Sequence, residues 1–275
     1  MPGRRGSLRI GTSGWSYAHW RGVLYPQEAK PAEFLALYAG VFSTVELNAS
    51  FYRMQRAETF RRQAAAVPEG FLFAVKAHRS ITHEKRLEGV QTGWREFVST
   101  AAALGGKLGP VLLQFPPSFR CRLDLLEAFL DGHRRAFGEA PRLAFEFRHG
   151  SWFEAGAMEL LRAHGAAMVV ADSSRYPQAP LEPVAPFVYL RFHGPEALFA
   201  SSYSDQQLRK WADRIHGWIG AGLDVYAYFN NDGGGCAVRN ALRLRELVGA
   251  NEPRRDAVQT AGGKARRDSS QAGPG

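Results

Sequence analysis

The feature that most constrains the fold is an alternation of short apolar runs with segments of helical periodicity along most of the chain. Strand candidates are enriched in β-branched or aromatic residues and mostly flanked by Gly, Pro, Ser or Asn. They are Leu8–Gly11, Thr44–Leu47, Leu72–Lys76, Val111–Phe115, Leu143–Phe147, Met168–Ala171, Val188–Phe192 and Val225–Phe229. Helix candidates are Glu33–Ala39, Glu58–Ala66, Trp94–Leu104, Leu123–Phe137, Glu154–His164, Asp205–Gly220 and Ala237–Val248. The alternation predicts an α/β fold: a single eight-stranded parallel β/α barrel of the TIM type.

Length and composition fit one such domain. With 275 residues, 45% of them hydrophobic, the chain can bury one large core. We expect an N-terminal extension at 1–7, the barrel at 8–250 and a disordered basic tail at 251–275. The link from Asp172 to Phe187 is rich in proline, so we expect no regular helix there. Because we find neither an apolar signal region nor a long apolar run, we expect a cytoplasmic protein that does not bind membranes.

Within the predicted strands, polar residues alternate with apolar ones and gather toward the carboxyl end. Glu46 lies between Val45 and Leu47, and Glu146 lies between Phe145 and Phe147. The apolar face must pack on the helices, so the polar face must point into the barrel. Active sites of β/α barrels lie at this carboxyl-terminal mouth. We therefore predict catalytic roles for Glu46, Lys76, His78, Glu146, Asp172 and His193, and substrate binding by Asn48, Gln114, Arg148, Arg191, Asn230, Trp15 and Tyr52.

Several motifs in this order resemble the family called domain of unknown function 72. They are IGTSGWSYAHWRGVLYP (Ile10–Pro26), FSTVELNASFYRM (Phe42–Met54), FAVKAHRSITH (Phe73–His83), LGPVLLQFPPSF (Leu108–Phe119), FEFRHGSW (Phe145–Trp152), YLRFHG (Tyr189–Gly194) and YFNND (Tyr228–Asp232). The resemblance covers about residues 8 to 248. It implies a β/α barrel related in shape to sugar isomerase and apurinic endonuclease barrels, and it implies no particular activity.

The charges favour an anionic ligand, since the chain has a formal net charge of +9. We expect an enzyme, with hydrolase-like chemistry on phosphodiester or phosphorylated substrates as the leading function. One alternative is a barrel that binds nucleic acid without catalysis. Another is a metal-free lyase or isomerase that acts on a small anionic metabolite, with Arg148 and Arg191 as anion ligands.

Two further questions stay open at this stage. A divalent metal held by carboxylates is considered but not favoured, because Lys76, Arg148 and Arg191 are expected in the same layer. Lys76 could instead be a Schiff-base amine. An ion pair with Glu46 is the simpler expectation for this lysine, and a structural ion network is the simpler expectation for the whole layer.

Overall fold

The computed structural model describes residues 4–249. It is an α/β fold in which every paired strand is parallel to its neighbours. The strands are β1 (Leu8–Thr12), β2 (Thr44–Leu47), β3 (Leu72–Lys76), β4 (Leu108–Gln114), β5 (Leu143–Glu146), β6 (Ala167–Met168), β7 (Val170–Asp172), β8 (Phe187–Phe192) and β9 (Asp224–Phe229). One sheet has the order β1-β9-β8-β7 and the other the order β2-β3-β4-β5-β6.

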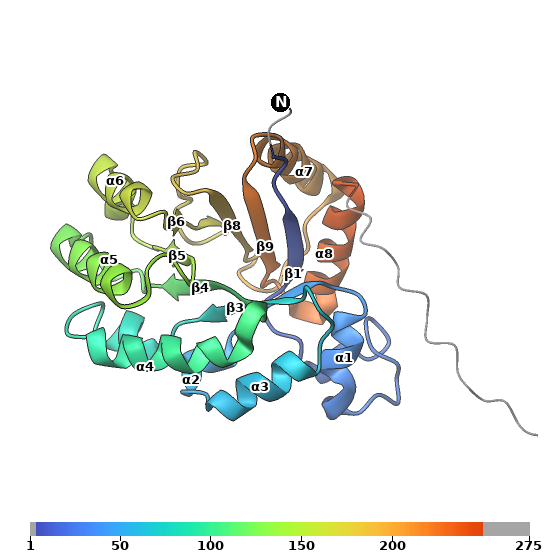
Figure 1. Ribbon diagram of the computed structural model, residues 1–275. Coiled ribbons are helices and arrows are strands. Elements are labelled where there is room, and N and C mark those ends of the chain that lie inside the picture. Colours follow the sequence, from blue (N-terminus) through green and yellow to red (C-terminus); the bar gives the residue numbers. More distant parts are fainter. Residues whose placement is uncertain (1–3, 250–275) are drawn as a thin grey trace, which may run out of the picture.

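The helices lie around the outside of the strands (Figure 1). They are α1 (Phe34–Ala39), α2 (Ala49–Tyr52), α3 (Ala57–Ala65), α4 (Gln91–Ala101), α5 (Leu123–Phe137), α6 (Ala155–Ala163), α7 (Asp205–Gly220) and α8 (Cys236–Leu247). The seven predicted helices correspond to α1 and to α3 through α8. The short helix α2 was not predicted, and residues 173–186 contain no regular helix, as expected.

The predicted strands are present, but the sixth is divided and the strands form two sheets of four and five. Met168 is paired with Phe145 of β5, whereas Val170 is paired with Leu190 of β8. The chain therefore changes its partner strand at Val169, which divides the expected run into β6 and β7. At the other junction, a single parallel bridge joins Ser13 to Glu46, next to the ends of β1 and β2.

The alternation of the strands is confirmed by two separate core clusters. Outward residues such as Val75, Phe145 and Leu190 belong to the large cluster that also contains the apolar residues of the helices. Inward residues form a second cluster, made up mainly of alanines from β3, β5 and β6 and tyrosines from β8 and β9. The hydroxyl groups of Thr44 on β2 and Tyr228 on β9 are 2.7 Å apart. This contact joins the inner faces of the two sheets.

The amino-terminal ends of the strands are held by a buried carboxylate. Asp224 at the start of β9 accepts hydrogen bonds from Arg4, Ser7 and Arg142. Residues 4–7, expected as an extension, thus contact the body of the domain. The tail predicted at 251–275 lies outside the described residues. No helix within residues 4–249 has the length and apolarity needed to cross a bilayer.

Candidate functional site

At the carboxyl-terminal ends of the strands, Arg191 is buried between two glutamates. Its Nε and Nη2 donate to Glu46 at 3.0 and 2.7 Å, and its Nη1 donates to Glu146 at 2.5 Å. All three side chains are at most 1% exposed. Because β8 supplies the arginine and β2 and β5 the glutamates, this triad bridges the two sheets. Much of the predicted ion network is therefore present, and its centre is Arg191.

Both glutamates are held as carboxylates by the groups around them. Glu46 also accepts hydrogen bonds from Ser13 at 2.7 Å and Tyr189 at 2.8 Å. Burial alone would raise the pKa of Glu46, but the Arg191 charge and these hydrogen bonds outweigh it and lower the pKa. The pKa of Glu146 is lowered well below its usual value, against the effect of burial, mainly by Arg191 and Arg148. Neither carboxylate is therefore a good proton acceptor near neutral pH.

Lys76 belongs to the same layer but is not part of the ion network. Its Nζ donates to the side-chain oxygen of Gln114 at 2.9 Å and lies 4.0 Å from the centre of the Phe51 ring. Among residues 4–249, no ion pair includes Lys76, so the expected pairing with Glu46 is wrong. Burial first, and then the nearby charge of Arg191, lower the pKa of Lys76 to about 7.

Arg148 contacts the network with only one of its nitrogens. Its Nε donates to Glu146 at 2.8 Å, and its guanidinium lies over the ring of Tyr176, 4.2 Å from the ring centre. Within the described chain, Nη1 and Nη2 of Arg148 make no hydrogen bond. These two nitrogens form the planar donor edge that binds a carboxylate or phosphate.

His193 is fully buried beside the triad. The amide nitrogen of Asn230 is 3.2 Å from its Nδ1, and its Nε2 lies 3.4 Å from a Glu146 oxygen but makes no hydrogen bond among the described residues. Burial lowers the pKa of His193 despite this carboxylate, which favours the neutral ring. The ring of Phe199 packs edge-on against the His193 ring, with 5.4 Å between the two ring centres. His193 thus lies close to both Glu146 and Phe199.

Lys76, Arg148 and Arg191 line a cleft of about 610 Å³, whereas Glu46, Glu146 and His193 are buried and are not among its lining residues. The cleft is lined by Asn48, Phe51, Tyr52, Lys76, Arg79, His83, Gln114, Arg148, Arg191, Phe199, Asn230 and Asp232. Seven of them were predicted as site residues. The buried side-chain oxygen of Asn48 has no hydrogen-bond partner among the residues described. A cleft of this size suits a small organic molecule.

Five lining residues were not predicted, and they lie on connections rather than strands. Asp232 accepts hydrogen bonds from Trp20 at 2.6 Å and His19 at 2.8 Å, and burial raises its pKa. His83 lies edge-on to Phe51, and burial, with the charge of Lys76, lowers its pKa to about 4. The others are Phe51, Arg79 and Phe199. In the sequence, four of these five positions lie within the motifs that resemble the family.

Three further predicted residues lie apart from both the cleft and the ion network. The carboxylate of Asp172 accepts a hydrogen bond from Trp211 of α7 at 2.8 Å, so it faces the helices. The Nδ1 atom of His78 is 2.8 Å from the Ser80 hydroxyl, within the turn after β3. Trp15 is half-buried and packs against the outer core. The structure thus separates these three from the residues around Arg191.

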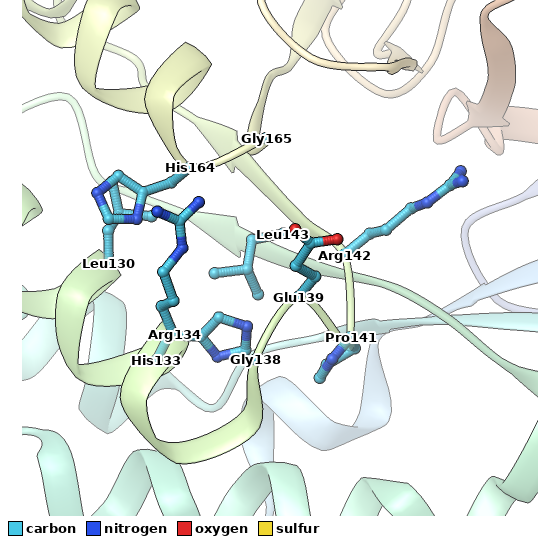
Figure 2. Close-up of a pocket in the computed structure, with 10 residues that line it drawn as sticks. All are labelled: Leu130, His133, Arg134, Gly138, Glu139, Pro141, Arg142, Leu143, His164 and Gly165. Atoms are coloured by element: carbon cyan, nitrogen blue, oxygen red, sulfur yellow. The ribbon is translucent and has the colours of Figure 1, made fainter.

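A second, much smaller pocket lies near the amino-terminal end of β5, with a volume of about 20 Å³. Figure 2 shows the side chains of His133, Arg134 and Glu139 around it, while Arg142 points away from them. This volume holds about one water molecule. Across residues 4–249, no group of three or more His, Cys, Asp or Glu side chains is arranged to hold a metal ion.

Comparison with known proteins gives a consistent result. Residues 9–263 match the family described as "Protein of unknown function DUF72". The UPF0759 protein YunF of Bacillus subtilis is 29% identical over 271 residues, covering 88% of this chain and 94% of that protein. A DUF72 family structure from Thermotoga maritima is 30% identical, with a TM-score of 0.75, and covers 88% of this chain and 99% of its own. One from Enterococcus faecalis is 21% identical with the same TM-score, covering 89% and 96%.

Proposed function

Since the chain belongs to the DUF72 family of unknown function, we propose that its cleft binds a small organic anion and that the protein is an enzyme acting on it. The observation that carries this proposal is that Lys76 and Arg148 line one cleft and neither is saturated by carboxylates. Arg191 differs from both, because three of its nitrogens already donate to glutamates. The anion therefore binds to Arg148 and Lys76 and rests above Arg191.

Of the functions considered from the sequence, a lyase or isomerase acting on a small anionic metabolite is best supported. Phosphodiester hydrolysis with a divalent metal would need carboxylates as ligands. Glu46 and Glu146, the buried carboxylates of this layer, are bound by arginines instead. A base is still available, because the pKa of Lys76 is about 7. Phosphorylated and carboxylated metabolites remain within the proposed class.

We also infer that the two sheets form one closed barrel of eight strands, with β6 and β7 as halves of its sixth strand. The bridge between Ser13 and Glu46 supports closure on one side. The single residue between β6 and β7 supports it on the other. In such a barrel the cleft would occupy the usual position of the active site.

The proposal is tested by calorimetric titration with inorganic phosphate and with pyruvate at low salt. Wild-type protein should bind at least one of them, and Arg148→Ala should weaken binding by about tenfold, the effect expected from losing charge-assisted hydrogen bonds. Arg61→Ala is the matched control, because Arg61 lies on the exposed surface of α3 and pairs with Glu58. Absence of binding by the wild type, or equal affinity in Arg148→Ala, would contradict the proposal.

A further inference from the structure

We propose that Lys76 is a covalent catalytic residue, whose ε-amine forms an imine with a carbonyl group of the bound anion. This assigns the substrate class as 2-oxo acids and phosphorylated aldehydes or ketones. The inference rests on the proposed function, since it takes the anion to be held by Arg148. Beyond anion binding, it requires a covalent bond between Nζ of Lys76 and a carbonyl carbon of the ligand.

The position of the Lys76 amine supports this role. Lys76 is the last residue of β3, and its side chain extends along the inner face to the floor of the cleft. It is 9% exposed, and its amine contacts the Gln114 amide oxygen and the Phe51 ring. An ammonium ion has three donors and is strongly hydrated. One neutral acceptor and one aromatic face replace that hydration only in part, which favours the neutral amine.

The surroundings of Lys76 differ from those of Lys107, another lysine with a largely buried side chain. The Lys107 ammonium donates to the carbonyl oxygens of Ala64 at 2.7 Å and Val67 at 2.8 Å, and Glu69 lies 4.0 Å away. These acceptors suit a permanent positive charge that ties the end of α3 to the loop before β4. Lys76 lacks such acceptors and faces a cleft, so its surroundings suit a nucleophile rather than a structural cation.

Both acids of the inner layer pair with Arg191 rather than with the amine of Lys76. Glu46, Glu146, Arg148 and Arg191 are the charged groups that act on Lys76 across the cleft floor, and His83 faces it from the loop after β3. The two carboxylates are already bound to Arg191. The two arginines act with burial to lower the pKa of Lys76 to about 7. A substantial fraction of the amine is therefore neutral near pH 7.

The step balances without an oxidant or a reductant. The nitrogen lone pair attacks the carbonyl carbon, a C–N bond forms, and the carbonyl electron pair moves to oxygen. A proton passes from nitrogen to that oxygen to give a carbinolamine. Uptake of one proton from solvent then releases the oxygen as water and leaves a protonated imine. The protonated imine can donate to the Gln114 side-chain oxygen, the acceptor that the lysine already contacts.

The experiment is reductive trapping of the full chain with pyruvate and sodium borohydride, read by intact mass and peptide mapping. We expect one adduct, on Lys76, and no adduct on Lys107, whose ammonium donates to two backbone carbonyl oxygens. Lys76→Arg keeps a positive charge but removes the amine, and it should abolish the adduct. Arg148→Ala should reduce the rate with pyruvate much more than the rate with acetone, which has no carboxylate.

The outcomes separate this inference from the proposed function. Calorimetric binding of pyruvate without any Lys76 adduct would overturn the imine and leave anion binding standing. Adducts spread over surface lysines, or an unchanged adduct in Lys76→Arg, would also overturn it. A Lys76 adduct that forms equally fast with acetone and pyruvate, and is unaffected by Arg148→Ala, would support the reactive amine and contradict the anion site.

Discussion

Replacing Arg191 with methionine should destabilise the protein severely, since it leaves two buried carboxylates without their shared cation. Removing one partner of a buried ion pair typically costs 3–5 kcal/mol, to order of magnitude. Arg191 serves two carboxylates, but Glu46 keeps Ser13 and Tyr189 as donors and Glu146 keeps Arg148. We therefore expect a loss of about 4 kcal/mol in the free energy of unfolding at pH 7, rather than twice that figure.

The pH dependence of this loss provides an independent check. In the wild type the pKa values of Glu46 and Glu146 are lowered, so their contribution is present above about pH 4.5 and is lost as the pH falls below it. Without Arg191, burial becomes dominant and raises both pKa values. Protonation then favours the folded variant as the pH falls from 7 toward 5. The destabilisation should consequently be smaller at pH 5 than at pH 7.

The assay is urea denaturation followed by tryptophan fluorescence at both pH values. A matched variant combines Arg191→Met with Glu46→Gln and Glu146→Gln, which removes all three charges. Because the single change is costly mainly through uncompensated charge, this triple variant should be more stable than Arg191→Met by about 1–2 kcal/mol. A single variant within about 1 kcal/mol of the wild type, or a triple variant less stable than the single one, would refute the reasoning.

Two further predictions concern carboxylates outside the cleft. Hydrogen bonds and the Arg142 charge lower the pKa of Asp224 to about 2, against the effect of burial. Asp224→Asn should therefore lower the free energy of unfolding by about 2 kcal/mol at pH 7 and by progressively less as the pH falls toward 2. Urea titrations at several pH values measure this loss. An equal loss at all pH values would contradict this. Asp172→Asn should lower the free energy of unfolding by about 1 kcal/mol, because the hydrogen bond from Trp211 becomes weaker. Phosphate affinity, measured by calorimetry, should stay unchanged. A binding loss like that of Arg148→Ala would place Asp172 in the site.

The inward direction of the polar side chains could be predicted because it depends only on the two-residue period of a strand. That period places Glu46, Lys76, Gln114 and Arg191 on inner faces, where the structure has them. The same rule, applied strictly, places Asp172 with Met168 and Val170. Both of these are in the outer cluster. The outward direction of Asp172 was therefore contained in the sequence, and the prediction that it joins the site departed from the pattern.

Other features depend on information that the period does not carry. His78 follows the end of β3, and its bond with Ser80 belongs to the turn chemistry that ends the alternation. Asp232 and His83 lie on connections, whose paths are set by contacts distant in sequence. The division of the sixth strand arises from a change of partner at Val169, which involves β5 and β8 together. A local pattern cannot fix any of these.

Which charges neutralise one another in the inner layer depends on which side chains pair, not on how many acids and bases the layer contains. An ion pair between Lys76 and Glu46 was the simpler expectation, but Glu46 is in register with Ala74, so Lys76 lies two residues further along β3. Arg191 reaches both glutamates from β8. With Asp172 facing outward, two carboxylates remain for three cations. The pairs that form are structural, and the proposed site uses the cations left over, Lys76 and part of Arg148. A fold that buries an ion network can in this way hold an unpaired lysine with its pKa lowered to about 7.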